Sequence, residues 1–597
     1  VVLEVGIKNV PSLIIKTYRI NTVNYFREKG EEISTAIDLD GLVANEEKIV
    51  RYQEPEIRRH IERFEFPSID KPGVYVIELI GNGRSSRAVI RKGRLTFTER
   101  MGAAGHVFTV FDESFEKVQA PTLWLSGHEY SADKNGEITV PFTNNPVQQK
   151  IVLCHQGFAS LHQFSHQTES YLLQGGIYID REQLVEGQNA KILIRPELSL
   201  NGIPIAISLL EEVSLLVEST DLDNIGSTKE VKDFKLAQDR ESTFEFRVPE
   251  KLFRVNVTLK GKINKLSQNK KIDLAFSRSF DFNGIEVTEK VEDLHLRKTE
   301  DRYVIEVLGK NGEPRPGRPV RLTIKHKDFT RQVNITLQSD QSGKVDLGAL
   351  ADISWISGKG VEETSKTWTF AQDDHSYPEI LHGTTSTTLS LPLMDPAKEP
   401  SALVSLLETR GETFVKNQID KVTIKDGFIE IAPLPAGDYQ LFLKPRQLKM
   451  KIRITSGKTQ GSFAVSRDRS LALSLDKPLQ ITSLKKDQAK KELVIQLANS
   501  SRSTRVHVYA TRFLPTWNLY DQLGAFRFPN PWQTRMIPSI CQYISGRNIG
   551  DEYRYILERK YAHIFPGNML KLPSLLLNPW SLRKTDTGRS DAAAGES

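Results

Sequence analysis

The densest group of side chains that could bind a metal ion lies around Cys154. His155 follows it directly, and His162 and His166 come shortly after. Thiolate and imidazole are ligands that Zn²⁺ prefers, and a helix through His162 and His166 would place both on one face. The competing interpretation is a small buried thiol at the end of an apolar strand, with His155 on the opposite strand face. Surface or core histidines are the favoured interpretation, so no metal ligand is assigned.

Asp221, Asp223 and Asn224 resemble the opening of a calcium-binding loop. Such a loop alternates oxygen ligands and closes with a bidentate Glu at its twelfth position. Here the twelfth position is Lys232. A turn between strands is therefore the favoured interpretation.

Gly81-Asn-Gly83 and Gly309–Gly312 resemble phosphate-binding loops, but neither carries the Lys-Ser/Thr of a P-loop or opens a helix. Both are predicted to be hairpin turns. Asp373-Asp-His375 is predicted to be a charged loop.

Two cysteines, Cys154 and Cys541, lie far apart in the sequence. They could pair once, and their spacing leaves both the pairing and the redox compartment open. Neither lies in a known nucleophile signature, and no G-x-S-x-G elbow is present. The sequence therefore predicts a protein that is not an enzyme, with no catalytic residue, no cofactor and no metal.

The bulk composition is that of a large globular chain with several domains. Its 597 residues are 39% hydrophobic and 26% charged, with a net charge of +6. At roughly 100–200 residues per domain, this length predicts about four to six units. So mild a charge excess implies neither a nucleic-acid nor a membrane partner. No stretch approaches the ~18–20 apolar residues of a membrane helix.

The chain begins at Val1 without an initiator Met or a signal-peptide pattern, so Val1 is interpreted as a boundary inside a longer protein. Sequons at Asn256, Asn334 and Asn499 would fit a secreted protein, but they are close to chance in number, and their use stays open.

The stretch Phe66–Gly93 shows the device that recurs along the chain: a turn, a strand, a Gly-Asn-Gly turn and a return strand. Near-copies follow at 303–325 and 434–454. A Tyr just after a Gly at the start of a strand is typical of the tyrosine corner of β-sandwiches. This pattern is predicted for Tyr75, Tyr303 and Tyr439.

Many short strands separated by Gly and Pro turns predict an all-β chain of tandem antiparallel β-sandwiches of macroglobulin or immunoglobulin-like type. A small irregular, partly helical C-terminal segment follows. The predicted domains, in chain order, are a β-sandwich at 1–100, a small β domain at 101–167, β-sandwiches at 168–295, 296–376 and 377–465, a partial β domain at 466–515, and an irregular aromatic and Pro-rich segment with one helix and a disordered tail at 516–597.

Four local predictions accompany this scheme. The spacing of Ile57, Ile61 and Phe64 favours a short helix over an extended edge. Strands are predicted at 493–497 and 505–509. Residues 551–563 form the best predicted helix. The aromatic residues between Trp517 and Trp532 are predicted to pack along a neighbouring domain, and a carbohydrate or peptide platform is the alternative.

Three motifs resemble the macroglobulin domains of alpha-2-macroglobulin-like proteins: Pro72-Gly-Val-Tyr75, Gly312-Glu-Pro with the strand 320–324, and Leu434–Tyr439. The resemblance extends over residues 3–515 and implies tandem sandwiches of about a hundred residues. The covalent chemistry of that family needs a Cys-Gly-Glu-Gln thioester. Cys154 is followed by His-Gln-Gly and Cys541 by Gln-Tyr-Ile, so neither forms it. No site residue of the family carries over.

The resulting hypothesis is a non-enzymatic, macroglobulin-like scaffold or binding protein that presents sandwich surfaces to a protein partner, with proteases as candidates. Its expected location is extracellular or the cell envelope, and its oligomeric state is open. An alternative is an accessory β-sandwich region of a larger hydrolase or carbohydrate-active enzyme. A third hypothesis is a metal-stabilised domain around His155, His162 and His166.

Overall fold

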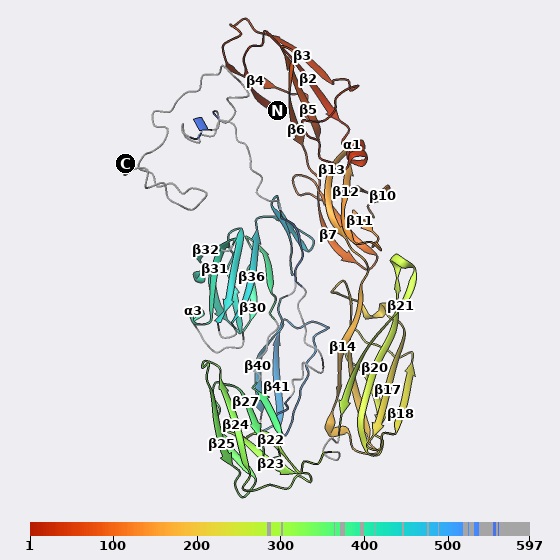
Figure 1. Cartoon of the computed structure of the whole chain (residues 1–597), viewed down its shortest axis with the longest axis vertical. Coiled ribbons are helices and arrows are strands. Elements are labelled where there is room, and N and C mark those ends of the chain that lie inside the picture. The colour runs from red at the N-terminus through yellow and green to blue at the C-terminus, as the bar shows by residue number, and fades with distance from the viewer. Residues whose placement is uncertain are drawn as a thin grey trace, which may run out of the picture. The chain divides into compact units, whose positions relative to one another are not determined.

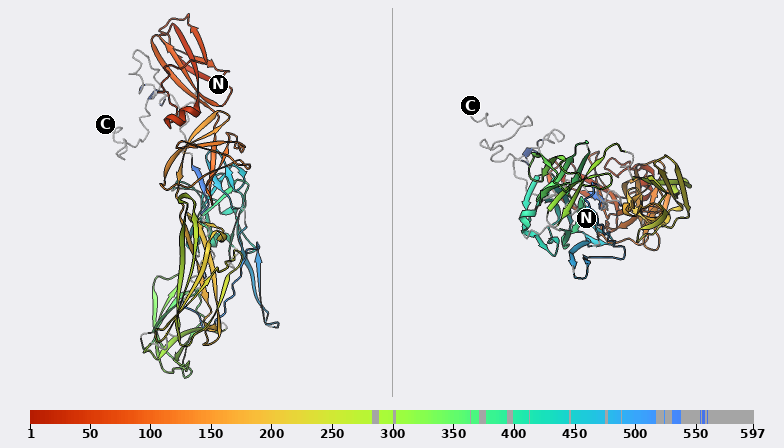
Figure 2. Two further views of the ribbon diagram at one scale, coloured as in Figure 1. Left: turned by 90° about the vertical axis from the view of Figure 1, so that its right-hand side faces the viewer. Right: turned by 90° about the horizontal axis from the view of Figure 1, so that it is seen from below.

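The computed structural model describes residues 1–516 apart from short gaps at 283–287, 300–301, 363, 371–376, 394–398, 412, 445–446, 475–476 and 488, then residues 523 and 530–536. Beyond residue 536 it describes Tyr553, Tyr555, Ile556 and Arg559, each in helical conformation; the rest of the predicted helix at 551–563 lies outside the described residues. Residues 1–536 form one compact unit and 537–597 a second. As predicted, the described chain is almost entirely antiparallel β-structure arranged as sandwiches (Figures 1 and 2).

The first sandwich packs a two-stranded sheet against a four-stranded one. Its strands are β1 (Val2–Ile7), β2 (Ser12–Ile20), β3 (Glu46–Arg51), β4 (His60–Glu65), β5 (Gly73–Gly81) and β6 (Arg84–Lys92), in the orders β1-β4 and β3-β2-β5-β6. β5 and β6 are the predicted strands of Phe66–Gly93. Asn82 and Gly83 join them with φ of 49° and 72°, the left-handed pair that a two-residue hairpin turn requires.

The helix predicted around Ile57 and Ile61 is wrong, because β4 pairs with β1 along its whole length and leaves Ile61 72% exposed. Cross-strand pairing here overrides the helical spacing. The sequence reasoning instead missed helix α1 (Thr22–Lys29). Its signals were Asn21, whose side chain accepts from the Asn24 amide, and Gly30, which ends the helix at φ 59°.

The second sandwich contains β7 (Thr96–Gly102), β8 (Gly105–Phe111), β9 (Thr122–Leu125), β10 (His128–Ser131), β11 (Glu137–Val140), β12 (Val147–His155) and β13 (Phe158–His166). Its sheets have the orders β11-β8-β7 and β10-β9-β12-β13. The turn at Asn135-Gly136 joins β10 to β11, which belong to different sheets, so it crosses between layers and is not a hairpin of one sheet.

The third sandwich contains β14 (Tyr171–Ile179), β15 (Asn189–Leu200), β16 (Ile203–Ile205), β17 (Glu211–Asp221), β18 (Gly226–Lys232), β19 (Ser242–Arg247), β20 (Leu252–Lys265) and β21 (Lys270–Asp281), with short 3₁₀ turns at Arg181–Gln183, Ile207–Leu209 and Leu266–Gln268. β15 pairs with β14, β16 and β19, and the other sheet has the order β18-β17-β20-β21.

The fourth sandwich contains β22 (Glu292–Thr299), β23 (Arg302–Gly309), β24 (Pro319–His326), β25 (Gln332–Gln338), β26 (Lys344–Gly348), β27 (Ile353–Lys359) and β28 (Ser365–Thr369). Its sheets have the orders β22-β23-β26 and β25-β24-β27-β28. It therefore repeats the second sandwich strand for strand.

The fifth sandwich contains β29 (Ile380–Thr384), β30 (Leu389–Pro392), α3 (Pro400–Leu403), β31 (Val404–Arg410), β32 (Thr413–Asn417), a 3₁₀ turn (Ile419–Lys421), β33 (Val422–Lys425), β34 (Phe428–Ile431), β35 (Gly437–Leu443) and β36 (Leu448–Thr455). Its sheets have the orders β29-β36-β35-β31-β32 and β30-β34-β33. β29 pairs parallel with β36, which distinguishes this sandwich from the preceding ones.

Two small sheets follow. β37 (Lys458–Gln460), β38 (Phe463–Val465), β39 (Arg469–Ala472) and β42 (Gln533–Met536) form one of them, and β40 (Gln480–Asp487) and β41 (Glu492–Ala498) form the other. β41 contains the predicted strand at 493–497. The strand predicted at 505–509 is wrong: Arg505 pairs with Glu241, the Tyr509 ring packs on Tyr178, and Leu514 N–H donates to Leu296 O. These residues form an extended strap over the third and fourth sandwiches.

The tyrosine corner is confirmed at two of its three predicted positions. The Tyr75 hydroxyl donates to Lys71 O over 3.0 Å and the Tyr439 hydroxyl to Pro435 O over 2.8 Å. Tyr303 instead packs edge-on against Phe370, with ring centroids 5.0 Å apart, and makes no corner bond among the described residues. No Gly precedes Tyr303, which follows Arg302 directly.

Candidate functional site

The three histidines among the candidate zinc ligands lie on one β-hairpin, and the helix that would have brought His162 and His166 together is absent. His155 ends β12, and His162 and His166 lie on β13. Positions four apart on a strand are separated by about 13 Å, so these rings do not converge. His162 Nε2 lies 2.7 Å from Leu95 O and His166 Nε2 lies 2.8 Å from Pro141 O, so each ring donates to a backbone carbonyl. No group of three metal-ligating side chains occurs among the described residues.

Cys154 is a buried thiol between the first and second sandwiches. It belongs to an apolar cluster with Phe26, Ile33 and Val152. Burial raises the pKa of the Cys154 thiol, which disfavours the thiolate that a nucleophile or a metal ligand needs. Cys541 lies outside the described residues, so the question of a disulfide stays open.

A buried histidine–carboxylate pair, which sequence reasoning missed, lies at the end of the second sandwich. His106 is fully buried, and its Nδ1 lies 2.6 Å from Glu99 Oε1. The Gln167 amide donates to His106 Nε2 over 3.1 Å. Because the backbone N–H of Gln167 can only donate, the Nε2 atom of His106 must be the unprotonated ring nitrogen that accepts. The proton is then on Nδ1, which donates to the Glu99 carboxylate. The same pairing orients the general base of a catalytic triad, but here both ring nitrogens are occupied by the fold.

The only sequence signal for this pair is its cross-strand register. Met101 lies opposite His106 in the β7–β8 hairpin, so Glu99 is a diagonal neighbour of His106. That placement becomes visible only once the register of the hairpin is known.

The linker that follows, residues 167–170, is fixed from both sides. Glu169 is buried, and its carboxylate accepts from the amides of Leu266 and Ser267 and from the Tyr171 hydroxyl. Burial acts to raise the pKa of Glu169, but these hydrogen bonds outweigh it and lower the pKa. From the second sandwich, the Asn144 side chain donates to Ser267 O over 3.1 Å.

The calcium-like segment is a turn, as predicted. Asp221 Oδ1 accepts from the amides of Asp223 and Ile225 over 2.9 and 2.8 Å, at the tip of the β17–β18 hairpin. The same carboxylate bonds to the second and fourth following amides recur at Asp112, Asp133 and Asp340. Their carboxylates therefore hold turns and do not form a cation site.

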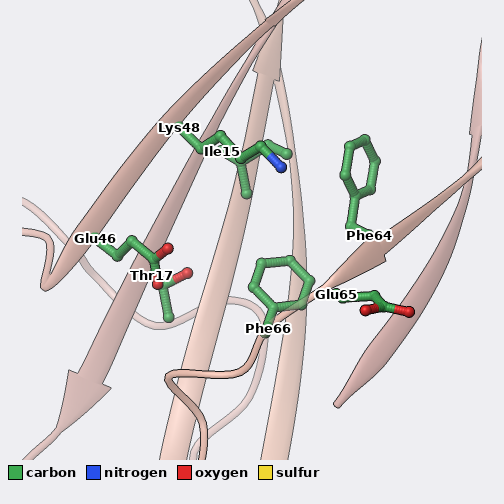
Figure 3. A pocket seen from close by; sticks show the side chains of 7 residues that line it. All are labelled: Ile15, Thr17, Glu46, Lys48, Phe64, Glu65 and Phe66. Carbon is green, nitrogen blue, oxygen red and sulfur yellow. The ribbon is translucent and has the colours of Figure 1, made fainter.

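A small cleft lies between the two sheets of the first sandwich (Figure 3). Side chains of β2, β3 and β4 and the residue after β4 line it, among them Thr17, Glu46 and Phe66. Its volume is about 20 Å³, which holds about one water. No substrate fits there.

The two predicted phosphate-loop look-alikes are turns: Asn82-Gly83 joins β5 to β6, and Gly312 N–H donates to Gly309 O over 2.9 Å. The charged loop predicted at Asp373–His375 lies outside the described residues, as do Trp517, Tyr520, Phe526 and Phe528.

Of the aromatic residues from Trp517 to Trp532 the structure describes Trp532 alone, so the packing of their side chains stays a prediction. Leu523 is buried against Gly176 of β14, where a Cβ would lie 2.1 Å from the Leu523 carbonyl carbon. Ala472 N–H donates to Trp532 O over 2.9 Å. The Gly175-Gly176 pair inside a strand was the available sequence signal for such a close backbone approach.

Exposed apolar side chains gather on edge strands. Val333 on β25 is 59% exposed, Phe414 on β32 58% and Leu484 on β40 62%. Such surfaces are candidates for protein contacts. No helix of the described part of the chain is long and apolar enough to span a membrane.

Comparison with known proteins matches two segments to immunoglobulin-like domain families. Residues 13–93 match the family described as the first immunoglobulin-like domain of AbpF, and residues 180–288 match its third immunoglobulin-like domain. The chain contains tandem immunoglobulin-like domains. It is 32% identical over 618 residues to "Actin-binding protein F" of Dictyostelium discoideum, an alignment that covers 98% of this chain and 26% of that protein. The chain thus spans about a quarter of the length of this relative.

Two solved structures match the chain at low identity and low TM-score. A cryo-EM structure of native Escherichia coli alpha-2-macroglobulin is 12% identical, covers 80% of this chain and 36% of its own, and has a TM-score of 0.23. Immunoglobulin domains 1–5 of Sidekick-1 are 10% identical, cover 74% of this chain and 92% of their own, and have a TM-score of 0.12. Likeness at this level carries no argument, so the macroglobulin-like assignment stays a prediction.

Proposed function

We propose that the chain is a non-enzymatic scaffold of tandem immunoglobulin-like domains and that its protein partner is actin. The observation that carries the proposal is the 32% identity to Actin-binding protein F, which extends over 98% of this chain. Since the likeness extends through all the sandwiches, a binding property of the relative is a reasonable hypothesis for the segment. This segment corresponds to 26% of that relative, so the segment itself must be tested.

The chemistry of the described residues supports a scaffold. His106 donates to Glu99 through Nδ1 and accepts from the Gln167 backbone amide through Nε2. Asp221 and its counterparts bond to turn amides. The groups that could have formed a site hold the fold instead, which leaves the sheet surfaces and loops for recognition.

Co-sedimentation with actin filaments tests the proposal. The purified chain is expected to pellet with filaments in a saturable manner and to stay in the supernatant without them. A chain that stays in the supernatant at filament concentrations of tens of micromolar would contradict the proposal, because that corresponds to binding weaker than about −6 kcal/mol.

The macroglobulin-type hypothesis proposes a protease as the partner. It draws on the sandwich motifs at Pro72–Tyr75 and Leu434–Tyr439. Incubation with trypsin followed by intact-mass spectrometry is expected to show no acyl adduct, because neither Cys154 nor Cys541 lies in a thioester sequence. A stable complex on gel filtration would favour the protease, and turnover of a glycan or peptide panel would favour the accessory-enzyme alternative.

The two partners imply different compartments, since actin filaments are cytosolic and the sequence-based expectation is extracellular or the cell envelope. N-glycosylation at the sequons would distinguish the two compartments. Asn256 is bonded to Glu218 within a central strand, whereas Asn334 is exposed on the edge strand β25. A glycan at Asn334, read by peptide mass spectrometry, would support secretion.

A further inference from the structure

The β40–β41 hairpin, labelled in Figure 1, carries several large apolar side chains that are exposed to solvent. Leu484 is 62% exposed, Leu493 50% and Ile481 41%. Apolar side chains that gather in this way on a soluble protein mark interaction surfaces more often than isolated ones do.

The register of the hairpin places these side chains on one face. Leu484 lies opposite Ile495, Lys486 opposite Leu493, and Ile481 opposite Leu497, with a bulge between Ile481 and Ser483. Opposed residues share a face, and so do residues two apart on a strand. Ile481, Leu484, Lys486 and Leu493 are therefore neighbours on what we call the hairpin face.

Hydrogen bonds anchor the base of the hairpin to the fifth sandwich, while no other strand of the described part of the chain pairs with the hairpin. Gln480 is buried, and its side chain donates to Leu393 O and Gly427 O of the fifth sandwich over 3.3 and 3.2 Å. Asn499 closes the base through Pro478 O over 2.8 Å. Among the described residues β40 and β41 form a sheet of two strands only, which is marginal without further contacts.

The end of the hairpin is basic. Lys485, Lys486, Lys490 and Lys491 are exposed there, against the acidic Asp487 and Glu492. Lys486, Lys491 and Leu493, together with Glu492, line a shallow depression of about 420 Å³. Apolar contact beside a positive charge is complementary to a protein surface that combines apolar side chains with carboxylates.

We propose that the hairpin face binds an apolar, carboxylate-bearing protein surface and that this surface belongs to the actin filament. The assignment of actin rests on the function proposed above. A nucleic acid fits less well, since the exposed leucines would gain nothing from phosphate. A second copy of the chain fits less well too, because two hairpin ends in contact would bring their lysines together and repel each other.

Two variants of the full chain test the proposal in co-sedimentation with actin filaments. Leu484→Ser with Leu493→Ser removes apolar contact, and Lys486→Glu with Lys490→Glu reverses the charge. Each is expected to weaken binding at least about tenfold. In the charge variant, the affinity for actin filaments should also depend less on salt concentration. The control, Ile57→Ser with Ile61→Ser before and within β4, removes exposed apolar side chains outside the candidate contact surfaces and should bind as the unaltered chain does.

The outcomes separate the two proposals. If the unaltered chain pellets with filaments and both hairpin variants pellet equally well, the hairpin assignment is overturned and the proposed function stands. If the unaltered chain does not pellet, the proposed function fails, and the assignment of actin to the hairpin fails with it. If the leucine variant abolishes only self-association in sedimentation velocity, the occupant is a second copy and the proposal is wrong.

Discussion

At the scale of single residues, the Asp and His side chains whose spacing resembles a metal or catalytic site stabilise the fold instead. Asp112, Asp133, Asp221 and Asp340 each accept two turn amides through one carboxylate oxygen. Burial lowers the pKa of His166, and its Nδ1 has no hydrogen-bond partner among the described residues. Asp and His at suggestive spacings are therefore poor evidence for a site in a chain this rich in turns.

His382 gives a pH prediction at this scale. Its Nδ1 donates to Ala472 O over 3.0 Å, and its buried Nε2 has no partner among the described residues. Burial, with Arg453 and Arg469 nearby, lowers the pKa of His382 from 6.5 to about 4. The folded state then resists a proton that the unfolded state accepts, so stability present above pH 6.5 is lost as the pH falls toward 4.

Thermal melting of the His382→Gln variant checks this expectation. The unaltered chain should lose melting temperature in the transition of the fifth sandwich between pH 6.5 and 4, and the variant should lose less over that range. Parallel curves for the two proteins would show that His382 does not titrate in this way.

At the scale of elements, the strand-and-turn device was predictable, and pairing that is distant in sequence was not. The Gly-Asn-Gly turn and the alternating apolar residues predicted β5 and β6 correctly, because both signals are local in the sequence. The segment that contains Ile57 and Ile61 has helical spacing, but β1 decides its conformation by pairing with β4. The alternation of Arg505–Tyr509 has no neighbouring strand to pair with among the described residues, and its side chains pair with Glu241 and Tyr178 instead.

The open edge of β1 gives a prediction at this scale. In the second, third and fourth sandwiches the strand that corresponds to β1 is covered by β7, β14 or β22, whereas β1 pairs with β4 alone among the described residues. Its inward Leu3 and Val5 are accordingly only half-buried, while Ile192 and Ile194 of β15 are fully buried. The first sandwich therefore has a weaker edge than the sandwiches that repeat its topology.

Hydrogen exchange followed by mass spectrometry checks this weakness. Val1 and Phe66 exchange hydrogen bonds across β1 and β4, so the amides of Val2, Glu4 and Gly6 alternate toward the open edge. They should exchange roughly a hundredfold or more faster than those of Ile192–Ile194, whose strand is paired on both sides. Equal protection would mean that another group covers the edge in solution.

At the scale of the molecule, the composition and the turn spacing predicted tandem sandwiches, but not how neighbouring sandwiches are joined. The sequence of the linker 167–170, Gln-Thr-Glu-Ser, is typical of an ordinary polar connection. In the structure Gln167 is bonded to the second sandwich through His106, and Glu169 to the third through Leu266 and Ser267. Neither anchor is local in sequence, so no pattern in the linker itself shows that it is rigid.

This double anchoring predicts that the second and third sandwiches unfold as one cooperative unit. Glu169→Ala would leave the amides of Leu266 and Ser267 unsatisfied and free the linker, at a cost of roughly 2–4 kcal/mol. In calorimetry of the full chain, the second and third sandwiches should then unfold in two separate transitions, whereas in the unaltered chain they share one. Glu197→Ala, which removes an exposed glutamate of the same sandwich, should leave the shared transition intact. If Glu169→Ala lowers the melting temperature without splitting the transition, the linker stabilises the third sandwich but does not couple it to the second.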